Sequence, residues 1–495
     1  MASEYLQNLT QNFAAVSASL LVLGLAVVSL RKSSSGRPPV VPYWLPWIGS
    51  AVSLGKDPDG FFKKAVDTLG PVFRVKAAGR DMIYVTSPEL INVLYRNAKT
   101  YDFVPIRLEI SETVFQIPIP QMTRVVDHYY PDHHRLLSPK SIGPILDRYA
   151  QYAFEDLTPK IASMNGKAVN LFDLLIPPAF TAASAAFFGR ELPAQELYSD
   201  FAEFNDAFHL ITAGIPRWMM PAPHRAWDKV IAAVEEYYKG VKEKDLDEVP
   251  ELVRLTIETC TPAGLSDRIA ACLLAGDLWA MEANAIWAAY WFVVELLQRP
   301  AEYELVLQEL DTVRNAWIGA HSDTPLSSTT FADFMRDSAN SLPLMSSGLL
   351  ECLRLRTSTF SIRRVAEPAE LGGYKLDVGE QLICATRSVH LDAEVHEDPY
   401  DFVLDRYVEG PLKKATKNGK TVPNHSMPFG GGISMCEGRH FAQSEIKTFT
   451  ALLLTYCTLE VAFTETWPEM RMDRLGVGII SPKGDVSVLV KQRNL

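Results

Sequence analysis

The sequence lacks the clustered basic charge that nucleic-acid-binding proteins use to bind phosphates. Its 495 residues carry 48 Lys and Arg against 59 Asp and Glu, a formal net charge of −11, and no run of basic residues. Because phosphate recognition needs such clusters, we expect no nucleic-acid partner. The hydrophobic fraction of 47% and the charged fraction of 22% are typical of a folded globular chain and exclude a largely disordered one.

Cysteine is also scarce. The six cysteines lie far apart, with no CxxC pair and no histidine at zinc-ligand spacing. A disulfide framework is not expected in so long a chain with so few cysteines. We expect five of them to be small buried side chains, whereas Cys436 has unusual neighbours; the five are Cys260, Cys272, Cys352, Cys384 and Cys457.

One uncharged apolar run stands near the N-terminus. Residues 13–30 read FAAVSASLLVLGLAVVSL, which as a helix would be about 27 Å long, the hydrocarbon thickness of an endoplasmic reticulum bilayer. Arg31 and Lys32 follow the run and only Glu4 precedes it, so the bulk of the chain is expected on the cytosolic side. A cleaved signal peptide is the alternative, disfavoured because no basic segment precedes the run and no small-x-small cleavage site follows it.

These features predict four segments. They are a short lumenal segment (1–12), a single transmembrane anchor (13–30), a proline-rich hinge (31–50) and one catalytic domain (51–495). Within that domain the patterns predict a hairpin over 72–87, mostly helices over 140–355 with a long apolar helix over 267–297, and strands over 359–386. The predicted fold class is therefore mainly α with small β-sheets. Residues 214–227 (GIPRWMMPAPHRAW) form an apolar loop that is either core or membrane-contacting.

The most informative motif surrounds Cys436. Residues 428–442 read PFGGGISMCEGRHFA, where consecutive glycines permit close backbone approaches. A helical pattern follows Cys436, so its thiol would lie near backbone N–H groups and the positive end of a helix dipole, which lower a thiol pKa. The resulting thiolate suits an iron ligand that favours O–O cleavage. The alternative is a buried free cysteine after a glycine turn.

FGGGISMCEG resembles the cysteine loop of the cytochrome P-450 superfamily. The resemblance implies the P-450 fold and heme b (iron protoporphyrin IX), with Cys436 as the axial iron ligand and Phe429 and Gly430 in the heme-binding loop. The family usually places Arg or His two residues before the cysteine, on a heme propionate. Here that position is Ser434, so the resemblance does not extend to this contact.

Three charged residues resemble the family's structural cluster. Glu351 and Arg354 lie three apart on a predicted helix, as in the ExxR helix, and Arg406 in HEDPYDFVLDRY resembles the arginine that completes the cluster. Such a buried triad is plausible only when each member is paired, and its implied role is to fix the region beneath the heme.

By the same resemblance, Arg363 in TFSIRR and Arg135 in DHHRLL are candidates for propionate contacts. The family often has Trp four positions before the second arginine, where this chain has Pro131.

Residues 273–291 (LLAGDLWAMEANAIWAAYW) resemble the oxygen-activating helix, with Ala283 at the place of the usual acid and Asn284 at the place of the usual alcohol. Asn284 can donate and accept hydrogen bonds but cannot act as an acid, and Glu282 stands one position away, so both are catalytic candidates. This register is similar to the branch that contains cholesterol 7α-hydroxylase, oxysterol hydroxylases and prostacyclin synthase.

The resemblance implies a monooxygenase of the endoplasmic reticulum membrane. It would take electrons from NADPH through cytochrome P-450 reductase and hydroxylate a lipophilic substrate, namely a sterol, a steroid or a related polycyclic terpenoid. One alternative is a heme-thiolate isomerase or dehydratase similar to prostacyclin synthase, which needs no external electrons. Another is a non-catalytic protein that binds heme or a sterol.

Overall fold

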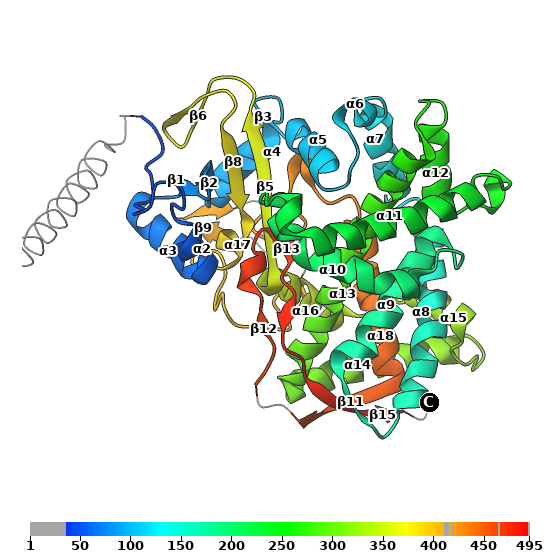
Figure 1. Ribbon diagram of the computed structural model, residues 1–495. Coiled ribbons are helices and arrows are strands. Elements are labelled where there is room, and N and C mark those ends of the chain that lie inside the picture. The colour runs from blue at the N-terminus through cyan, green and yellow to red at the C-terminus, as the bar shows by residue number, and fades with distance from the viewer. Residues whose placement is uncertain (1–35, 410–414, 418, 423, 464–465, 494–495) are drawn as a thin grey trace, which may run out of the picture.

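One long helix runs through the middle of the structure, and other helices pack around it (Figure 1). The computed structural model describes residues 36–409, 415–417, 419–422, 424–463 and 466–493. The central helix, α13 (Asp267–Leu297), begins after Ser266, whose hydroxyl accepts the N–H of Ile269. Most of its side chains are buried, because helices pack around it, with the most extensive contacts from α9 (Leu171–Phe188), α11 (Pro221–Val241), α16 (Pro343–Arg356) and α18 (Arg439–Tyr456).

The other helices complete a helical body beside the sheet. Several helices begin with proline, which favours the first helical position because its missing N–H is not needed there. The remaining helices are α2 (Ala51–Lys56), α3 (Pro58–Leu69), α4 (Pro88–Arg96), α5 (Val104–Thr113), α6 (Ile119–Met122), α7 (Val126–Leu136), α8 (Gly143–Met164), α10 (Ala194–Thr212), α12 (Glu251–Cys260), α14 (Pro300–Ala320), α15 (Ser328–Asp337) and α17 (Thr386–His390). Short 3₁₀ turns are η1 (Arg217–Met219), η2 (Leu246–Glu248), η3 (Gly432–Ser434) and η4 (Met472–Arg474).

The largest sheet lies at one side of this body (Figure 1) and has the order β1-β2-β8-β5-β13, with β3 also paired to β5. β1 and β2 form an antiparallel hairpin through Ala78 and Gly79, both of which have positive φ, as a two-residue hairpin turn requires. β2 is parallel to β8, and the other pairs are antiparallel. The strands are β1 (Val72–Ala77), β2 (Arg80–Val85), β3 (Tyr101–Asp102), β5 (Thr357–Val365), β8 (Gln381–Ala385) and β13 (Val477–Ile479).

Within the described residues there are four smaller sheets. One has three strands, in the order β11 (Cys457–Phe463), β15 (Ser487–Gln492) and β4 (Ala168–Asn170). The others are pairs: β6 (Ala369–Leu371) with β7 (Tyr374–Leu376), β9 (Ala415–Lys417) with β10 (Lys420–Val422), and β12 (Glu469–Met470) with β14 (Pro482–Lys483).

These elements confirm the predicted fold class, mainly α with small sheets. The hairpin over 72–87 and the helix over 267–297 are also confirmed. The loop predicted over 214–227 is wrong in its second half, because α11 begins at Pro221. The core alternative applies to the end of this segment, since Trp227 is fully buried, whereas Trp218 is 80% exposed.

The predicted anchor over 13–30 lies outside the described residues. Among the described helices, α9 and α13 are long and apolar enough to cross a membrane, but 78% and 61% of their most apolar windows are buried inside the protein. Such burial identifies them as core helices of the folded body.

Candidate active site

Cys436 is the exposed cysteine of the chain, whereas the other five, all within the described residues, are buried as expected. It lies three residues before α18, which begins at Arg439 after the cap residue Gly438. The N–H of Cys436 donates to the carbonyl of Phe429 (2.9 Å), and this hydrogen bond closes the glycine loop. The loop therefore presents the thiol at the mouth of a helix, as the sequence predicted.

The glycines let this loop approach α4 closely. Gly432 has a φ of +63°, and a Cβ at this position would lie 2.6 Å from the carbonyl oxygen of Tyr95. Any other residue there would meet both backbone strain and a steric clash with α4. Gly431 likewise faces the ring of Tyr95 at a distance that excludes a Cβ. The sequence analysis did not single out Tyr95, since nothing in the motif indicates which helix the loop meets.

The thiol of Cys436 differs from the prediction in one respect. The predicted lowering of its pKa is wrong as a net direction: burial raises the pKa, and the charge of Glu437 adds to this. The backbone N–H groups of Gly438 and Arg439 act in the predicted, lowering sense but do not prevail. Although the side chain is exposed by area, the surrounding protein desolvates the sulfur enough to decide the direction.

Arg363 reaches the loop at Ser434, the position where the P-450 pattern has Arg or His. Its guanidinium donates to the hydroxyls of Ser434 and Ser361, the latter at 3.0 Å. The side chain is fully buried, and burial lowers the pKa of the guanidinium. Its Nε has no hydrogen-bond partner within the described part of the chain. A fixed guanidinium therefore stands next to Ser434 with donor capacity left.

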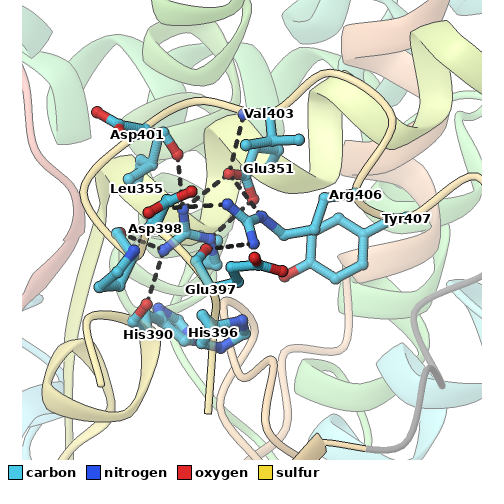
Figure 2. Close-up of polar contacts among 12 residues, drawn as sticks. Glu351, Leu355, His390, His396, Glu397, Asp398, Asp401, Val403, Arg406 and Tyr407 are labelled. Carbon is cyan, nitrogen blue, oxygen red and sulfur yellow. Dashed lines mark hydrogen bonds and ion pairs between the residues drawn. The ribbon is translucent and has the colours of Figure 1, made fainter. Parts of the chain in front are cut away.

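The structure brings Glu351, Arg354 and Arg406 together, as Figure 2 shows for Glu351 and Arg406. Glu351 accepts from Arg354 through both carboxylate oxygens, each at 2.7 Å, and from Arg406 Nε at 2.9 Å. The two arginines then donate to backbone carbonyls of the chain between β8 and β9, which are those of His390, Glu397, Asp398, Pro399 and Asp401. The triad thereby fastens this segment to α16.

Arg135, the other candidate for a propionate contact, lies apart from this group. Its side chain is 74% exposed and pairs with Asp132 at 2.9 Å. The neighbouring His133 is buried instead, and its Nε2 lies 3.1 Å from Asp277 of α13, to which Tyr129 also donates (2.6 Å). The i, i+4 spacing of Tyr129 and His133 could have indicated this pair, but not its partner on α13.

The two catalytic candidates point in different directions from α13. Asn284 accepts the N–H of Ile479 in β13 (2.9 Å), which fixes its amide oxygen as an acceptor. Glu282 is fully buried and accepts from Ser184 of α9 (2.9 Å). Burial, together with the charge of Glu445 in α18, raises the pKa of Glu282 well above its usual value. The structure therefore does not bring these two side chains together.

Aromatic rings cover the part of α13 that precedes Asn284. Trp279 stacks on Phe208 of α10 with ring centroids 4.0 Å apart, and Phe115 lies 5.5 Å from Trp279. The indole N–H of Trp279 donates to Asn205 (3.1 Å), which fixes the ring against α10. These rings form an apolar cluster in which Phe208 is buried and Phe115 and Trp279 are partly buried.

The residues around Cys436 fit heme b better than a bare metal ion. In the described ranges no three His, Cys, Asp or Glu side chains are grouped for an ion. One thiol beside close-packed glycines fits an iron whose other ligands come from a macrocycle. The unpartnered Nε of buried Arg363 fits a carboxylate such as a propionate, because guanidinium donors pair well with carboxylates.

Comparisons with known proteins agree with this fit. A family model described as Cytochrome P450 matches residues 38–488. The 25-hydroxycholesterol 7-alpha-hydroxylase of Rattus norvegicus is 28% identical, over 81% of this chain and 97% of its own. Prostacyclin synthase of Bos taurus is 27% identical, over 92% of this chain and 94% of its own. The solved structure of retinoic acid-bound cyanobacterial CYP120A1 has a TM-score of 0.72 at 20% identity, covers 93% of this chain and 100% of its own, and shows the likeness of fold.

Proposed function

This chain belongs to the cytochrome P450 family and is a monooxygenase-type oxidoreductase with heme b as its cofactor, and we propose that it hydroxylates a sterol, a steroid or a related polycyclic terpenoid. The observation that carries the proposal is the exposed thiol of Cys436 in a glycine loop beside Arg363. The substrate class is supported by the rat relative, whose name states action on 25-hydroxycholesterol. The aromatic cluster of Phe115, Phe208 and Trp279 suits contact with an apolar, flat molecule.

The proposal gives each residue of the site a role. When bound, the heme supplies the iron that activates dioxygen for hydroxylation. Cys436 Sγ would hold the iron, and Phe429 and Gly430 would shape the loop that carries it. Arg363 would bind a heme propionate, the contact that the family usually makes through Arg or His at the position of Ser434. Glu351, Arg354 and Arg406 keep the chain beneath the heme in place.

Asn284 is proposed as the residue that positions a water molecule or a substrate hydroxyl. Because its Oδ1 accepts from Ile479, its Nδ2 is the atom left to donate. Asn284 cannot supply a proton as an acid, and Glu282 lies in the core against Ser184. Proton delivery at this site would therefore run through water held by Asn284, with Glu282 in a supporting structural role.

The protein is proposed to sit on the cytosolic face of the endoplasmic reticulum membrane, with the apolar run over 13–30 as its anchor. Two exposed apolar groups support this placement: Trp44 and Trp47, which are 98% and 70% exposed, and Trp218, which is 80% exposed. Both groups border the β1–β2 turn, because Gly79 donates to the carbonyl of Trp47 and Arg80 donates to that of Thr212. Exposed tryptophans gathered on one side are typical of a surface that enters the membrane interface.

The test uses full-length, heme-loaded protein in vesicles with cytochrome P450 reductase, NADPH and a panel of sterols and terpenoids. We expect NADPH and dioxygen consumption that depends on one substrate class, together with a hydroxylated product. The second candidate is a heme-thiolate isomerase, favoured by Ala283 and Asn284 and by the bovine prostacyclin synthase relative. Rearrangement of a peroxide without reductase would establish that candidate and overturn the first.

Replacement of the thiol tests the central residue. Cys436→Ser should abolish the red-shifted Soret band of the ferrous–CO complex, because the band depends on a thiolate ligand. Cys457→Ala, at a buried cysteine, is the matched control and should keep the band. An unchanged spectrum in Cys436→Ser would show that another residue holds the iron.

A further inference from the structure

One histidine ring joins the arginine cluster to the segment that leads into the cysteine loop. His390, the last residue of α17, is fully buried, and its carbonyl accepts a hydrogen bond from Arg354 at 2.7 Å (Figure 2). Its ring Nε2 lies 2.9 Å from the backbone nitrogen of Met427, which is also buried. The backbone of His390 therefore belongs to the cluster around Glu351, whereas its ring contacts the chain that runs into Cys436.

The direction of this hydrogen bond fixes the protonation state of His390. A backbone N–H only donates, so Nε2 carries a lone pair and the ring is neutral, with its hydrogen on Nδ1. Burial, together with the charges of His396, Arg354 and Arg387, lowers the pKa of His390 well below its usual value, which favours this neutral form. Nδ1 has no partner among the described residues, so what the ring offers there is the acceptor at Nε2.

Two backbone hydrogen bonds continue from Met427 to Cys436. The carbonyl of Met427 accepts the N–H of Gly430 (3.0 Å), and that of Phe429 accepts the N–H of Cys436 (2.9 Å). Pro428 has no N–H and its φ is fixed, so this stretch has little freedom to adjust. A displacement of Met427 would therefore move the turn that carries the Cys436 thiol.

A second histidine contacts the same segment in the opposite sense. His396 Nε2 donates to the carbonyl of His425 (3.3 Å), and the two rings lie 5.6 Å apart. Burial and the charge of Arg354 lower the pKa of His396 to about 3, so this ring is neutral as well. The longer distance makes this the weaker of the two contacts. His390 is therefore the principal link.

We infer that His390 is a positioning residue for the heme-binding thiol: by accepting from Met427, it holds the segment before the glycine loop in the place set by the Glu351 cluster. An apolar side chain would leave the N–H of Met427 buried without an acceptor, and the segment would shift to pair it. The sulfur of Cys436 would move with the segment. The inference rests on the proposed role of Cys436 as the iron ligand, whereas the contact between His390 and Met427 does not.

Three substitutions at His390 separate this role from simple filling of the core. Glutamine places a carbonyl oxygen near the position of Nε2, whereas asparagine is shorter by a methylene group and leucine has no acceptor. If His390 acts as an acceptor, His390→Gln should keep the arrangement, and His390→Asn and His390→Leu should lose it. If the ring only fills space, leucine, which is apolar and similar in size, should be tolerated best.

Hydrogen exchange of the Met427 amide, followed by mass spectrometry on the full-length heme-loaded protein, tests the contact. We expect the amide to be protected in the wild type and in His390→Gln. It should exchange about 10-fold faster or more in His390→Asn and His390→Leu, as for a buried N–H that loses its partner. His224→Leu, at a buried histidine of α11, is the matched control and should exchange like the wild type. Equal exchange in the wild type and in His390→Leu would overturn the inference.

The ferrous–CO spectrum of the same samples tests the positioning of the thiol. The ratio of heme with the red-shifted Soret band to heme without it should fall about 10-fold in His390→Asn and His390→Leu, and stay close to the wild type in His390→Gln and His224→Leu. His396→Leu, at the weaker contact, should show a smaller fall, and it keeps the inference testable if the His390 variants do not retain heme.

The outcomes of the two measurements are distinguishable from a failure of the proposed function. Faster exchange at Met427 with an unchanged Soret band, or an equal loss of the band in all three His390 variants, would overturn the positioning role. The proposed function fails separately, if Cys436→Ser keeps the band or if the wild type forms no hydroxylated product.

Discussion

Two groups of buried ionisable side chains in this protein differ in how fully they are partnered. Around Glu351, both carboxylate oxygens accept hydrogen bonds, and Arg354 and Arg406 find further carbonyls. Behind α13, Glu282 and Glu445 each keep one oxygen that has no partner among the described residues. All three carboxyls are buried, and they differ in how many hydrogen-bond partners compensate for that burial.

The two groups consequently have different electrostatic states. Burial raises the pKa of Glu445 and of Glu282 well above the usual value, and only the hydrogen bonds from Ser184 oppose this at Glu282. Both carboxyls therefore lose their protons less readily in the folded protein than in the unfolded chain. The Glu351 cluster, by contrast, is a set of charges neutralised by close ion pairs. One group stabilises the fold through charge, and the other does so only while it stays neutral.

Removal of Glu351 should have the largest effect. Glu351→Gln leaves Arg354 buried without its counter-charge, so the free energy of unfolding should fall by about 3–5 kcal/mol, with loss of bound heme. Chemical denaturation and the ferrous–CO spectrum measure the two effects. Asp333→Asn is the matched control, because Asp333 and Arg336 have the same i, i+3 spacing but are half exposed, and it should cost less than about 1 kcal/mol.

The same type of substitution at Glu445, Glu445→Gln, should instead stabilise the protein. Since its pKa is raised in the folded state, the folded protein binds more protons than the unfolded chain as pH rises above about 4.5, and stability falls with pH in that range. A glutamine side chain does not titrate in this pH range, so it does not lose stability as the pH rises. Glu445→Gln should therefore raise the free energy of unfolding at pH 7 by up to about 3 kcal/mol and have little effect at pH 4.5.

Denaturation of the wild type and of the Glu445→Gln variant between pH 4.5 and pH 8 measures this difference. Glu460→Gln, at an exposed glutamate paired with Lys491, should show no such pH-dependent gain. A constant difference between the wild type and Glu445→Gln at every pH would mean that Glu445 does not titrate differently on folding.

The comparison also shows what could be predicted from the sequence. The Glu351–Arg354 pair and the glycine loop are local patterns, in which the spacing along the chain nearly fixes the contact. The contact of Arg363 with Ser434 joins residues 71 positions apart, so no local spacing indicates it. Glu282 and Asn284 lie about 200° apart around a helix, and only the packing of α9 and β13 shows which side each one faces.

The smallest expected effect concerns the hydrogen bond between Ser184 and Glu282. Ser184→Ala removes the donor to Glu282 Oε1 and should lower the free energy of unfolding by about 1 kcal/mol. The same substitution in a Glu282→Met background should cost clearly less, because no acceptor is left there to lose its partner. Ser163→Ala, at an exposed serine of α8, is the control and should be close to neutral. An equal cost in both backgrounds would mean that Ser184 contributes only packing, and that Glu282 is held by burial alone.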